Sequence, residues 1–387
     1  MPPTRSTHPP LTLMHLCFLV SGAGTLLLGP TLPVFALHWH LHDSQSGLLI
    51  AAQFLGLFTG SIAISRNLRA SLLSGTLIAA AGFALLALML HLTGAYAVGI
   101  IAFFLLGLGL GQMTASVNVL SALRYHAPQQ RSSVLALLNF TWSAGAVLSP
   151  LLAGLYLAHN AIVWLFLTFA AIASMLFLVV SLTLPTIPKP PTATPAAIAP
   201  SMPWPPLAYF FLLLFLYGGF EATLGGWLST YTLRYTTLGI AAASYSTTAL
   251  WAAFATGRAL AAAVLRYIPE NLVRIAGILL TTVSTIALRA VHTGLGIGIC
   301  AALIGLGIAP FFPITFSLLI SHSPSPRQAG AATANIGLGS AIFPLITGVI
   351  STHLHSLHAA MVTAIVIALA VLTLCSINPF ATRSLKA

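Results

Sequence analysis

Residues 185–206 read Pro-Thr-Ile-Pro-Lys-Pro-Pro-Thr-Ala-Thr-Pro-Ala-Ala-Ile-Ala-Pro-Ser-Met-Pro-Trp-Pro-Pro. Proline has no backbone N–H and interrupts helices, so this segment cannot cross a membrane as a helix. Long apolar runs resume on both sides of it. We therefore expect a semi-rigid linker that divides the chain into an N-terminal half, residues 1–184, and a C-terminal half, residues 207–387.

The composition identifies the apolar runs as membrane spans. Of 387 residues, 58% are hydrophobic and 4% are charged, whereas soluble domains carry about 25% charged residues. The alternating ten-residue segments of a β-barrel are absent, so we predict an all-α integral membrane protein. The twelve predicted transmembrane helices, six on each side of the linker, are 11–37, 46–66, 70–91, 94–124, 131–158, 160–184, 207–234, 240–266, 271–291, 294–321, 327–352 and 356–378.

Basic residues are unevenly distributed between the two sides of this predicted bundle. If the N-terminus is cytoplasmic, all of the 14 Lys and Arg residues except Arg234 and Arg289 fall on the cytoplasmic side. The positive-inside rule then places both termini and the linker in the cytoplasm of a multi-pass protein of the plasma (inner) membrane. Because the basic residues are scattered singly, the net charge of +11 does not indicate nucleic-acid binding.

The two halves share spacings of conspicuous residues. An arginine precedes an asparagine by the same distance in both halves, at Arg131 and Asn139 and at Arg327 and Asn335. The other shared positions are Gly22, Gly29, Gly145, Pro150 and Gly154 in the first half and Gly219, Gly226, Gly339, Pro344 and Gly348 in the second. A duplicated six-helix unit predicts two pseudo-symmetric bundles, with a substrate site where they meet.

One acidic residue lies near the middle of a predicted span. Glu221 belongs to the stretch Tyr217-Gly-Gly-Phe-Glu-Ala-Thr-Leu-Gly-Gly-Trp227, and the chain has only two other acids, Asp43 and Glu270. A carboxylate at the centre of a lipid-facing helix costs about 2.5–3.5 kcal/mol, so Glu221 should face the bundle interior. No arginine is evident at its depth. We expect Glu221 to exchange protons, although a structural, hydrogen-bonded acid is the alternative, and we expect Asp43 to cap the following helix.

Amide and indole side chains within the spans are further candidates for substrate contact. Amides donate and accept hydrogen bonds, which suits hydroxyl-rich ligands, and indole rings can stack on the apolar face of a sugar. Each amide could equally hold a neighbouring helix. With Glu221, the candidate substrate-binding residues are Gln53, Gln112, Asn118, Asn139, Trp142, Trp227 and Asn335.

Two histidine clusters, His38–His42 and His353–His358, fall on the predicted external side. No carboxylate or cysteine reinforces their spacing as a metal site. We expect solvated loops that respond to pH, and we expect neither a bound metal nor a cofactor.

Twelve spans in two repeated halves joined by a cytoplasmic linker resemble the major facilitator superfamily. The loop between the second and third spans of that superfamily normally reads Gly-x-x-x-Asp-Arg-x-Gly-Arg-Arg. Here Gly60-Ser-Ile-Ala-Ile-Ser-Arg66-Asn-Leu-Arg69 keeps the first glycine and two arginines but lacks the aspartate, and Gly257-Arg258 looks like its second-half counterpart. The resemblance implies that Arg66, Arg69 and Arg258 take part in conformational gating.

Within the superfamily, the stretch 217–227 is similar to the seventh span of the fucose-permease group of sugar:proton symporters. Asn118, Asn139 and Trp142 also fall where that group tends to place polar residues of the pore. The carboxylates that the group carries in its first and fourth spans have no match here. Proton coupling, if present, therefore depends on Glu221 alone or with a histidine.

These observations predict a secondary active transporter, acting as a monomer, that moves a small molecule by alternating access. A sugar or related polar metabolite is the expected substrate, with protons as the coupling ion. The alternative is an efflux antiporter for an apolar or cationic compound, which the sparse polar lining and the abundant phenylalanines favour. We do not expect an enzyme, because the spans contain neither paired acids nor a His/acid set and the chain lacks a nucleotide-binding loop.

Overall fold

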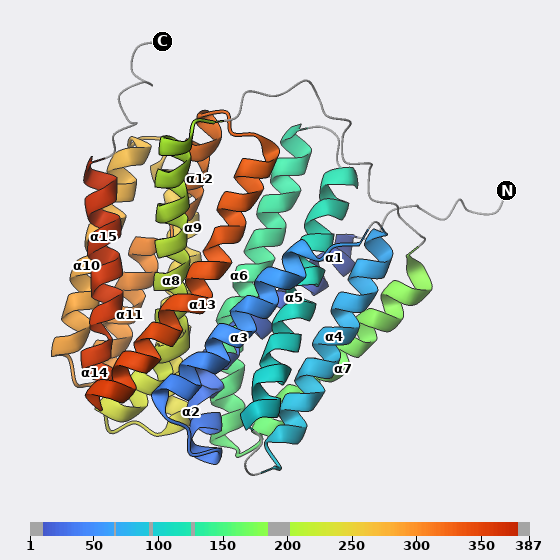
Figure 1. Cartoon of the computed structure of the whole chain (residues 1–387), viewed down its shortest axis with the longest axis vertical. Coiled ribbons are helices and arrows are strands. Elements are labelled where there is room, and N and C mark those ends of the chain that lie inside the picture. Colours follow the sequence, from blue (N-terminus) through green and yellow to red (C-terminus); the bar gives the residue numbers. More distant parts are fainter. Residues whose placement is uncertain (1–10, 66, 93–95, 125–127, 185–201, 378–387) are drawn as a thin grey trace.

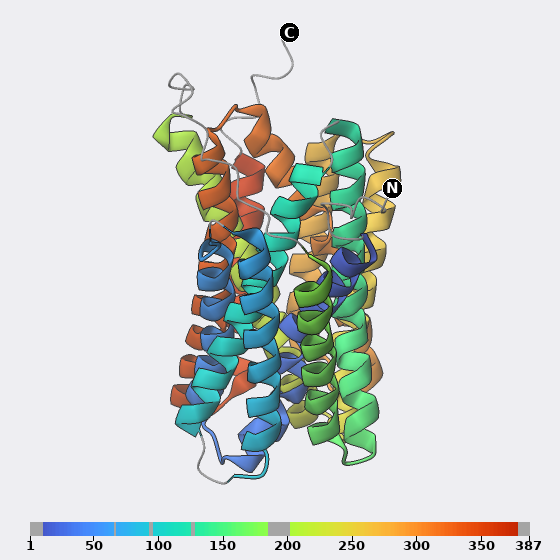
Figure 2. The same ribbon diagram turned by 90° about the vertical axis from the view of Figure 1, so that its right-hand side faces the viewer.

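The computed structural model describes residues 11–377 apart from residue 66 and the segments 93–95, 125–127 and 185–201. The described chain forms α-helices that run roughly along the long axis of the molecule (Figures 1 and 2). In order they are α1 (Leu11–Leu26), α2 (Leu28–His38), α3 (Asp43–Ile62), α4 (Leu68–Met89), α5 (Tyr96–Arg124), α6 (Pro128–Ala158), α7 (Ile162–Thr183), α8 (Trp204–Tyr235), α9 (Ile240–Val264), α10 (Glu270–Ala290), α11 (Gly294–Ile308), α12 (Phe311–Ser321), α13 (Pro326–Leu354), α14 (Leu357–Ala360) and α15 (Val362–Ile377).

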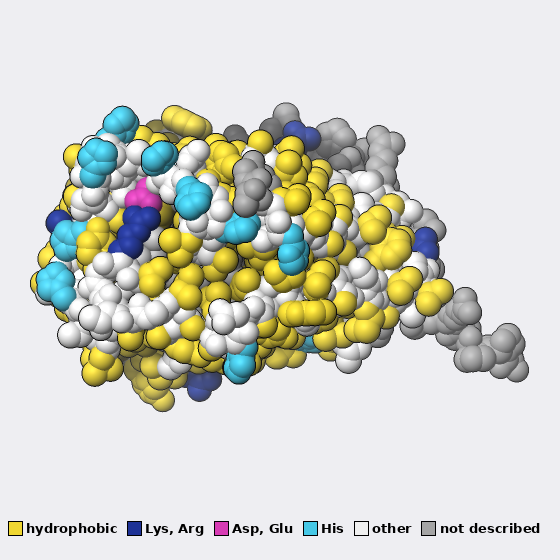
Figure 3. Space-filling view, turned by 90° about the horizontal axis from the view of Figure 1, so that it is seen from below, with side chains coloured by type: hydrophobic (Ala, Val, Ile, Leu, Met, Phe, Trp, Pro, Cys, Tyr) yellow, Lys and Arg dark blue, Asp and Glu magenta, His cyan; other side chains and the backbone are white. Residues whose placement is uncertain are grey.

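The helices form two groups, α1–α7 and α8–α15. In Figure 1, α4, α5 and α7 of the first group lie on the right, and α10, α11 and α15 of the second lie on the left. We call the end at which α7 ends and α8 begins the linker end. The opposite end carries His38, His42, His353 and His358 and is called the histidine end; histidine side chains are spread over it in Figure 3. Most of the expected linker, 185–201, lies outside the described residues.

All twelve predicted spans contain a helix or a broken pair of helices, which confirms the all-α membrane fold. In the described part of the chain, ten spans are long and apolar enough to cross a membrane, and α1 with α2, bent by 42°, makes an eleventh. The helix that does not meet this standard is α9. Its 25 residues include Ser244, Thr247 and Arg258, which lower its hydropathy, yet it packs within the bundle against α6 and α11.

Close helix contacts recur at equivalent places in the two halves. A Cβ added to Gly145 of α6 would lie 2.1 Å from the carbonyl oxygen of Leu19 on α1. A Cβ added to Gly339 of α13 would lie 1.9 Å from the carbonyl oxygen of Phe215 on α8. Only glycine permits backbones to approach this closely, so both halves are held by the same small-residue contact.

These contacts correct the predicted alignment of the first and seventh spans. Gly22 packs against the carbonyl oxygen of Trp142, and Gly218 packs against that of Ile336 in the same way. Gly22 is therefore equivalent to Gly218 rather than to Gly219. The sequence could not decide this, because the two consecutive glycines give the same spacing with a shift of one residue.

The expected equivalence of Asn139 and Asn335 is also wrong. Asn335 Nδ2 donates to the carbonyl oxygen of Phe211 on α8 at 2.7 Å. The corresponding contact in the first half joins Thr141 Oγ1 to His15 Nδ1 at 2.8 Å. Asn335 therefore corresponds to Thr141, because the two asparagines stand at different distances from the packing glycine that follows each of them.

Candidate functional site

A cavity of about 730 Å³ lies between the two halves. Its walls come from α1, α3, α5 and α6 of the first half and from α8, α9 and α13 of the second. It extends from Thr25 and Glu221, near the middle of the bundle, to Ile62 at the end of α3 and Gly330 near the start of α13. Ile62 is 62% exposed, so the cavity opens at the linker end.

Equivalent residues of the two halves face this cavity. The register fixed by the glycine contacts makes Thr25 of α1 the counterpart of Glu221 of α8. The other equivalent pairs in the wall are Leu26 with Ala222, Phe54 with Trp251, and Trp142 with Ile336. The cavity therefore lies on the pseudo-twofold axis, as expected for a substrate site built at the interface of duplicated halves.

Glu221 faces two polar groups of its own half. Its carboxyl interacts with the guanidinium of Arg258 and with the hydroxyl of Tyr217. The Arg258 guanidinium lies 4.3 Å from the ring centroid of Phe254, and its Nη1 donates to Ser143 Oγ of α6 at 3.3 Å. Arg258 thus acts electrostatically on the acid and donates a hydrogen bond to the opposite half.

The presence of Arg258 corrects the expectation that no arginine lies at the depth of Glu221. Arg258 lies in the part of α9 that is closer to the linker end. Helical side chains tilt toward the helix N-terminus, which for α9 is the histidine end. The long side chain therefore reaches back toward the middle of the bundle, which residue counting along the span does not reveal.

Two buried polar atoms in the cavity wall have no hydrogen-bond partner among the described residues. They are Thr25 Oγ1 and Trp251 Nε1, and both are buried. Buried polar groups in folded proteins are almost always paired. Thr25 and Trp251 were not among the predicted site residues. The equivalence of Thr25 to Glu221, once the halves are correctly aligned, is a signal that could have identified Thr25.

Three of the predicted substrate-binding residues line the cavity: Asn118, Trp142 and Glu221. Gln53 does not. It is 1% exposed and donates to the carbonyl oxygens of Gly24 and Thr25 at 3.3 and 2.8 Å, next to the bend between α1 and α2. Gln53 therefore stabilises the broken helix behind the cavity wall.

Gln112 and Asn139 make hydrogen bonds to other groups of the protein. Gln112 accepts from Ser74 Oγ at 3.0 Å and donates to the carbonyl oxygen of Ala63 at 3.1 Å. Asn139 is exposed and donates to the carbonyl oxygen of Leu135 in its own helix. Gln112 therefore fits the alternative of an amide that holds neighbouring helices, whereas the bond of Asn139 stays within α6.

Trp227 and Asn335 also lie outside the cavity. Trp227 is fully buried, and its Nε1 donates to the carbonyl oxygen of Pro344 at 3.0 Å. Asn335 is bonded to α8, as described above. Pro344 has no backbone N–H, so α13 lacks one intrahelical hydrogen bond at this position. The hydrogen bonds of Trp227 and Asn335 hold α13 against α8.

The predicted gating arginines are in different situations. Arg66 lies outside the described residues. Arg69 Nη2 donates to the carbonyl oxygen of Ser181 at 2.8 Å, which joins α4 to α7 within the first half. Arg258 does not line the central cavity itself but acts electrostatically on Glu221, which does. The described part of the chain also contains no group of three His, Cys, Asp or Glu residues that could hold a metal ion.

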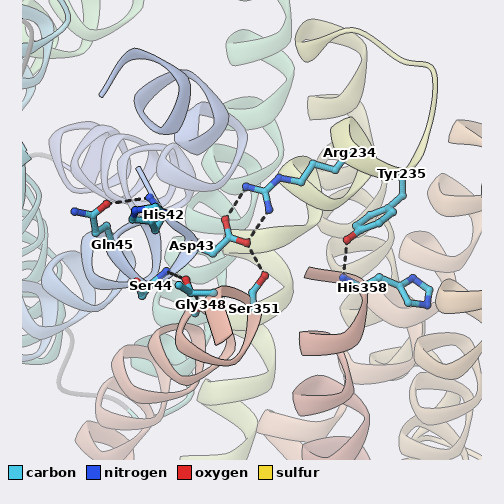
Figure 4. Close-up of polar contacts among 10 residues, drawn as sticks. His42, Asp43, Ser44, Gln45, Arg234, Tyr235, Gly348, Ser351 and His358 are labelled. Carbon is cyan, nitrogen blue, oxygen red and sulfur yellow. Dashed lines mark hydrogen bonds and ion pairs between the residues drawn. The ribbon is translucent and has the colours of Figure 1, made fainter. Parts of the chain in front are cut away.

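At the histidine end an ion pair joins the two halves. Arg234 of α8 donates from Nη1 and Nη2 to the two carboxylate oxygens of Asp43 at 2.7 and 2.6 Å (Figure 4). Ser351 Oγ of α13 donates to the same carboxylate, and the backbone N–H of Ser44 donates to Thr352 Oγ1 at 2.8 Å. Asp43 is therefore not the helix cap that the sequence suggested: the N-cap of α3 is His42, paired with Gln45.

Glycines bring the helix backbones together near the same end. A Cβ at Gly29 of α2 would lie 1.9 Å from the carbonyl oxygen of Gly225 on α8. A Cβ at Gly348 of α13 would lie 2.3 Å from the carbonyl oxygen of Asp43. The halves are in direct backbone contact here, so the central cavity is closed toward the histidine end.

Two pseudo-symmetric helical bundles around a central cavity that opens at one end and is sealed at the other define a membrane transporter. The sequence model of the Major Facilitator Superfamily matches residues 14–336, and the chain belongs to this superfamily. A search among curated proteins finds no significant match.

Solved structures share the fold over nearly the whole chain. A bacterial homolog of the human lysosomal transporter Spinster, in an inward-facing and occupied conformation, superposes with a TM-score of 0.75 at 14% identity, covering 95% of each chain. A D-xylose-proton symporter superposes with a TM-score of 0.73 at 14% identity, covering 93% of this chain and 96% of its own. At this level of identity the likeness extends to the fold alone.

Proposed function

We propose that this chain is a secondary active transporter that moves a sugar or related polar metabolite by alternating access and couples transport to protons through Glu221. The observation that carries the proposal is the position of Glu221. It lies in the cavity wall on the pseudo-twofold axis, beside Arg258. Intramembrane carboxyls in such positions mark ion and substrate pathways.

The chemistry of the cavity wall supports a substrate with hydroxyl groups. Trp142 and Trp251 provide aromatic faces, and Asn118 provides an amide that donates and accepts hydrogen bonds. Thr25 Oγ1 and Trp251 Nε1, which are buried and unpaired, add polar atoms to the wall at mid-depth. The likeness to a D-xylose-proton symporter and the sequence resemblance to the fucose-permease group point in the same direction.

The contacts of Arg258 suggest how a proton could influence the conformation. Arg258 interacts with Glu221 of its own half and with Ser143 of the other half. Protonation of Glu221 removes the negative charge, so the attraction on Arg258 falls. The position of the Arg258 side chain therefore depends on the charge of Glu221. Because Arg258 also donates to Ser143, the charge of Glu221 affects the contact between the halves.

We further propose that the linker end faces the cytoplasm, because nearly all basic residues are expected there. The structure then corresponds to an inward-open state of a monomer in the plasma (inner) membrane. A cysteine in place of Ser44, at the histidine end, should react only with an impermeant thiol reagent added outside intact cells. Labelling only from the inside would reverse the orientation.

The substitution Glu221→Gln tests the proposed function, because it preserves the shape of the side chain and removes its titration. Purified protein in liposomes is first screened with a panel of radiolabelled pentoses and hexoses that begins with D-xylose. We expect Glu221→Gln to lose accumulation driven by a proton gradient while substrate exchange at equal concentrations persists. Glu270→Gln is the matched control, since Glu270 lies at the start of α10, far from the cavity, and should behave as wild type.

The outcome separates three roles of Glu221. Retained accumulation in Glu221→Gln under a proton gradient alone excludes this residue as the coupling site. Loss of exchange together with accumulation makes it a direct substrate ligand and removes the argument for coupling. Failure of every sugar to be transported by the wild type rejects the substrate class.

A second candidate is efflux of an apolar cation. The specific observation is that most of the cavity wall is apolar, including Phe54, Leu57 and Phe58, while a single acid lies in it. Such a wall suits a hydrophobic ring system and Glu221 suits its positive charge. Proton-driven extrusion of tetraphenylphosphonium from liposomes, abolished by Glu221→Gln, would favour this function over sugar transport.

A further inference from the structure

A second cavity, of about 570 Å³, lies on the outer surface of the C-terminal half. Its walls come from α13 and α15, and α14 lines it at the histidine end. The walls are almost entirely apolar, and Leu354 and Val366 are each 57% exposed. A groove of this kind on the perimeter of a membrane-spanning bundle faces the hydrocarbon of the bilayer.

One cationic side chain borders this groove. Arg289, the penultimate residue of α10, is half-buried, and its Nε is buried. Among the described residues Arg289 has neither a hydrogen-bond partner nor an ion pair. Its guanidinium acts electrostatically on Tyr231 and on His358, neither of which supplies a negative charge at neutral pH.

No acid of this chain is placed to neutralise Arg289. Asp43 is already paired with Arg234, and Glu221 lies in the central cavity. Glu270 begins α10, the helix that carries Arg289 near its other end, so the two residues are separated by about 28 Å. The sequence contains no fourth acidic residue.

An uncompensated guanidinium near hydrocarbon is costly, and arginines at helix ends normally reach for the polar interface. An apolar groove with an unpaired cation at its border is complementary to an amphiphile with an anionic head group. We propose that this groove binds one anionic phospholipid from the bilayer leaflet at the histidine end. The phosphate pairs with Arg289, and an acyl chain lies between α13 and α15.

The groove favours a lipid over a free anion. Its one uncharged polar side chain, Thr363, is already engaged, since its hydroxyl donates to the carbonyl oxygen of Ala360 at 2.9 Å and contacts Thr347 Oγ1 at 2.6 Å. A small anion would therefore gain the single contact with Arg289. A phospholipid gains that contact and also covers the exposed apolar walls.

The site also adjoins the seal at the histidine end. Ile350 lines the groove, and the next residue, Ser351, donates to the Asp43 carboxylate. A bound lipid packs against the part of α13 that carries Ser351 and stabilises its hydrogen bond to Asp43. Lipid binding is therefore expected to stabilise the protein as well as to be detectable directly.

The test is native mass spectrometry of the detergent-purified full chain titrated with phosphatidylglycerol and with phosphatidylcholine of the same acyl chains. We expect one phosphatidylglycerol to bind in preference to phosphatidylcholine. Arg289→Gln should weaken phosphatidylglycerol binding by about five- to tenfold, as loss of one interfacial cation predicts. Arg289→Lys should retain most of it, and Arg266→Gln, an exposed arginine in the turn between α9 and α10, is the matched control that should retain all of it.

Two further arms separate a lipid from a free anion. Val366→Trp, which fills the groove without changing charge, should weaken phosphatidylglycerol binding although Arg289 is intact. Inorganic phosphate should not compete at millimolar concentration. Equal binding of the two lipids, unchanged binding in either Arg289→Gln or Val366→Trp, or effective competition by phosphate would overturn the proposal. Thermal unfolding of each variant verifies folding, and a given concentration of phosphatidylglycerol should raise Tm less in Arg289→Gln than in the wild type.

Discussion

The two ends of the bundle hold the halves together in different ways. At the histidine end, Arg234 and Asp43 form a two-pronged ion pair, and the backbones of α2 and α8 touch at Gly29 and Gly225. Toward the linker end, the halves are separated by the central cavity, and among the described residues the hydrogen bond that crosses between them is one of 3.3 Å from Arg258 to Ser143.

This difference bears directly on alternating access. A transporter must exchange its open and closed ends, so the two conformations can differ by only a few kcal/mol. A charged, partly buried ion pair and tight backbone contacts favour the closed histidine end. The hydrogen bond from Arg258 to Ser143 is long and its acceptor is uncharged, so it contributes little to holding the halves together toward the linker end. The contacts at the histidine end should therefore dominate the equilibrium in the absence of substrate.

The largest effect is expected from Gly29→Ala. The added Cβ would lie 1.9 Å from the carbonyl oxygen of Gly225, and backbone cannot yield as a flexible side chain can. Overpacking costs about 1–3 kcal/mol or more, so the histidine end should close poorly and transport should fall at least tenfold. Uptake in liposomes measures the loss, and a cysteine at Ser44 should gain reactivity toward thiol reagents.

Gly298→Ala is the matched control for this substitution. Gly298 is also helical, but a Cβ added there would meet no atom within 4 Å. Its transport and labelling should equal those of the wild type. If Gly29→Ala behaves like Gly298→Ala, the helix contact between α2 and α8 does not contribute to the seal.

The second effect concerns the ion pair itself. Asp43→Asn leaves Arg234 without its partner, and the side chain of Asp43 is 9% exposed while that of Arg234 is 38% exposed. A pair in this intermediate setting contributes about 1–3 kcal/mol, so the population should shift about ten- to a hundredfold toward opening of the histidine end. Distances between spin labels on α3 and α13, measured by pulsed electron paramagnetic resonance, report the shift.

The exchange of charges in the double variant Asp43→Arg with Arg234→Asp is the control for this prediction. Asp43→Arg alone places two arginines together and should open the histidine end further than Asp43→Asn. The double variant should restore much of the closed population. Identical distance distributions in Asp43→Asn and wild type would show that the glycine contacts close this end without the ion pair.

The fold could be predicted because it follows from composition and repetition. Twelve apolar ranges, with basic residues concentrated on one side and a proline-rich linker between the halves, predict helices of spanning length, and each range contains a helix or two consecutive helices. The register of the repeat could not be settled to the residue. The paired glycines at 218–219 allow two alignments, and only the backbone contact of Gly218 with Ile336 distinguishes them.

The candidate site could be predicted only in part. Burying a carboxyl in a span is costly, so Glu221 had to face the interior, and it lines the cavity. The roles of the amides were ambiguous because a hydrogen bond to a neighbouring helix and a hydrogen bond to a substrate both require the same residue types, Asn or Gln. Asp43 and Arg234 lie 191 residues apart, and the local position of Asp43 at a helix start concealed that pairing.

The smallest effect is expected at the linker end, and its sign matters more than its size. Ser143→Ala removes the acceptor that Arg258 contacts across the interface, at a length of 3.3 Å. Such a bond contributes about 0.5–1 kcal/mol, so the population should shift by about two- to fivefold. The linker end should widen, whereas Asp43→Asn widens the histidine end, because the Arg258–Ser143 bond joins α9 of one half to α6 of the other beside the open cavity. Spin labels on α6 and α9 near the linker end measure it, and Ser376→Ala, an exposed serine that bonds only its own helix, should leave the distances unchanged. A shift in the same direction as Asp43→Asn would mean that Ser143 stabilises the bundle as a whole, and the contrast between the two ends would then rest on the histidine end alone.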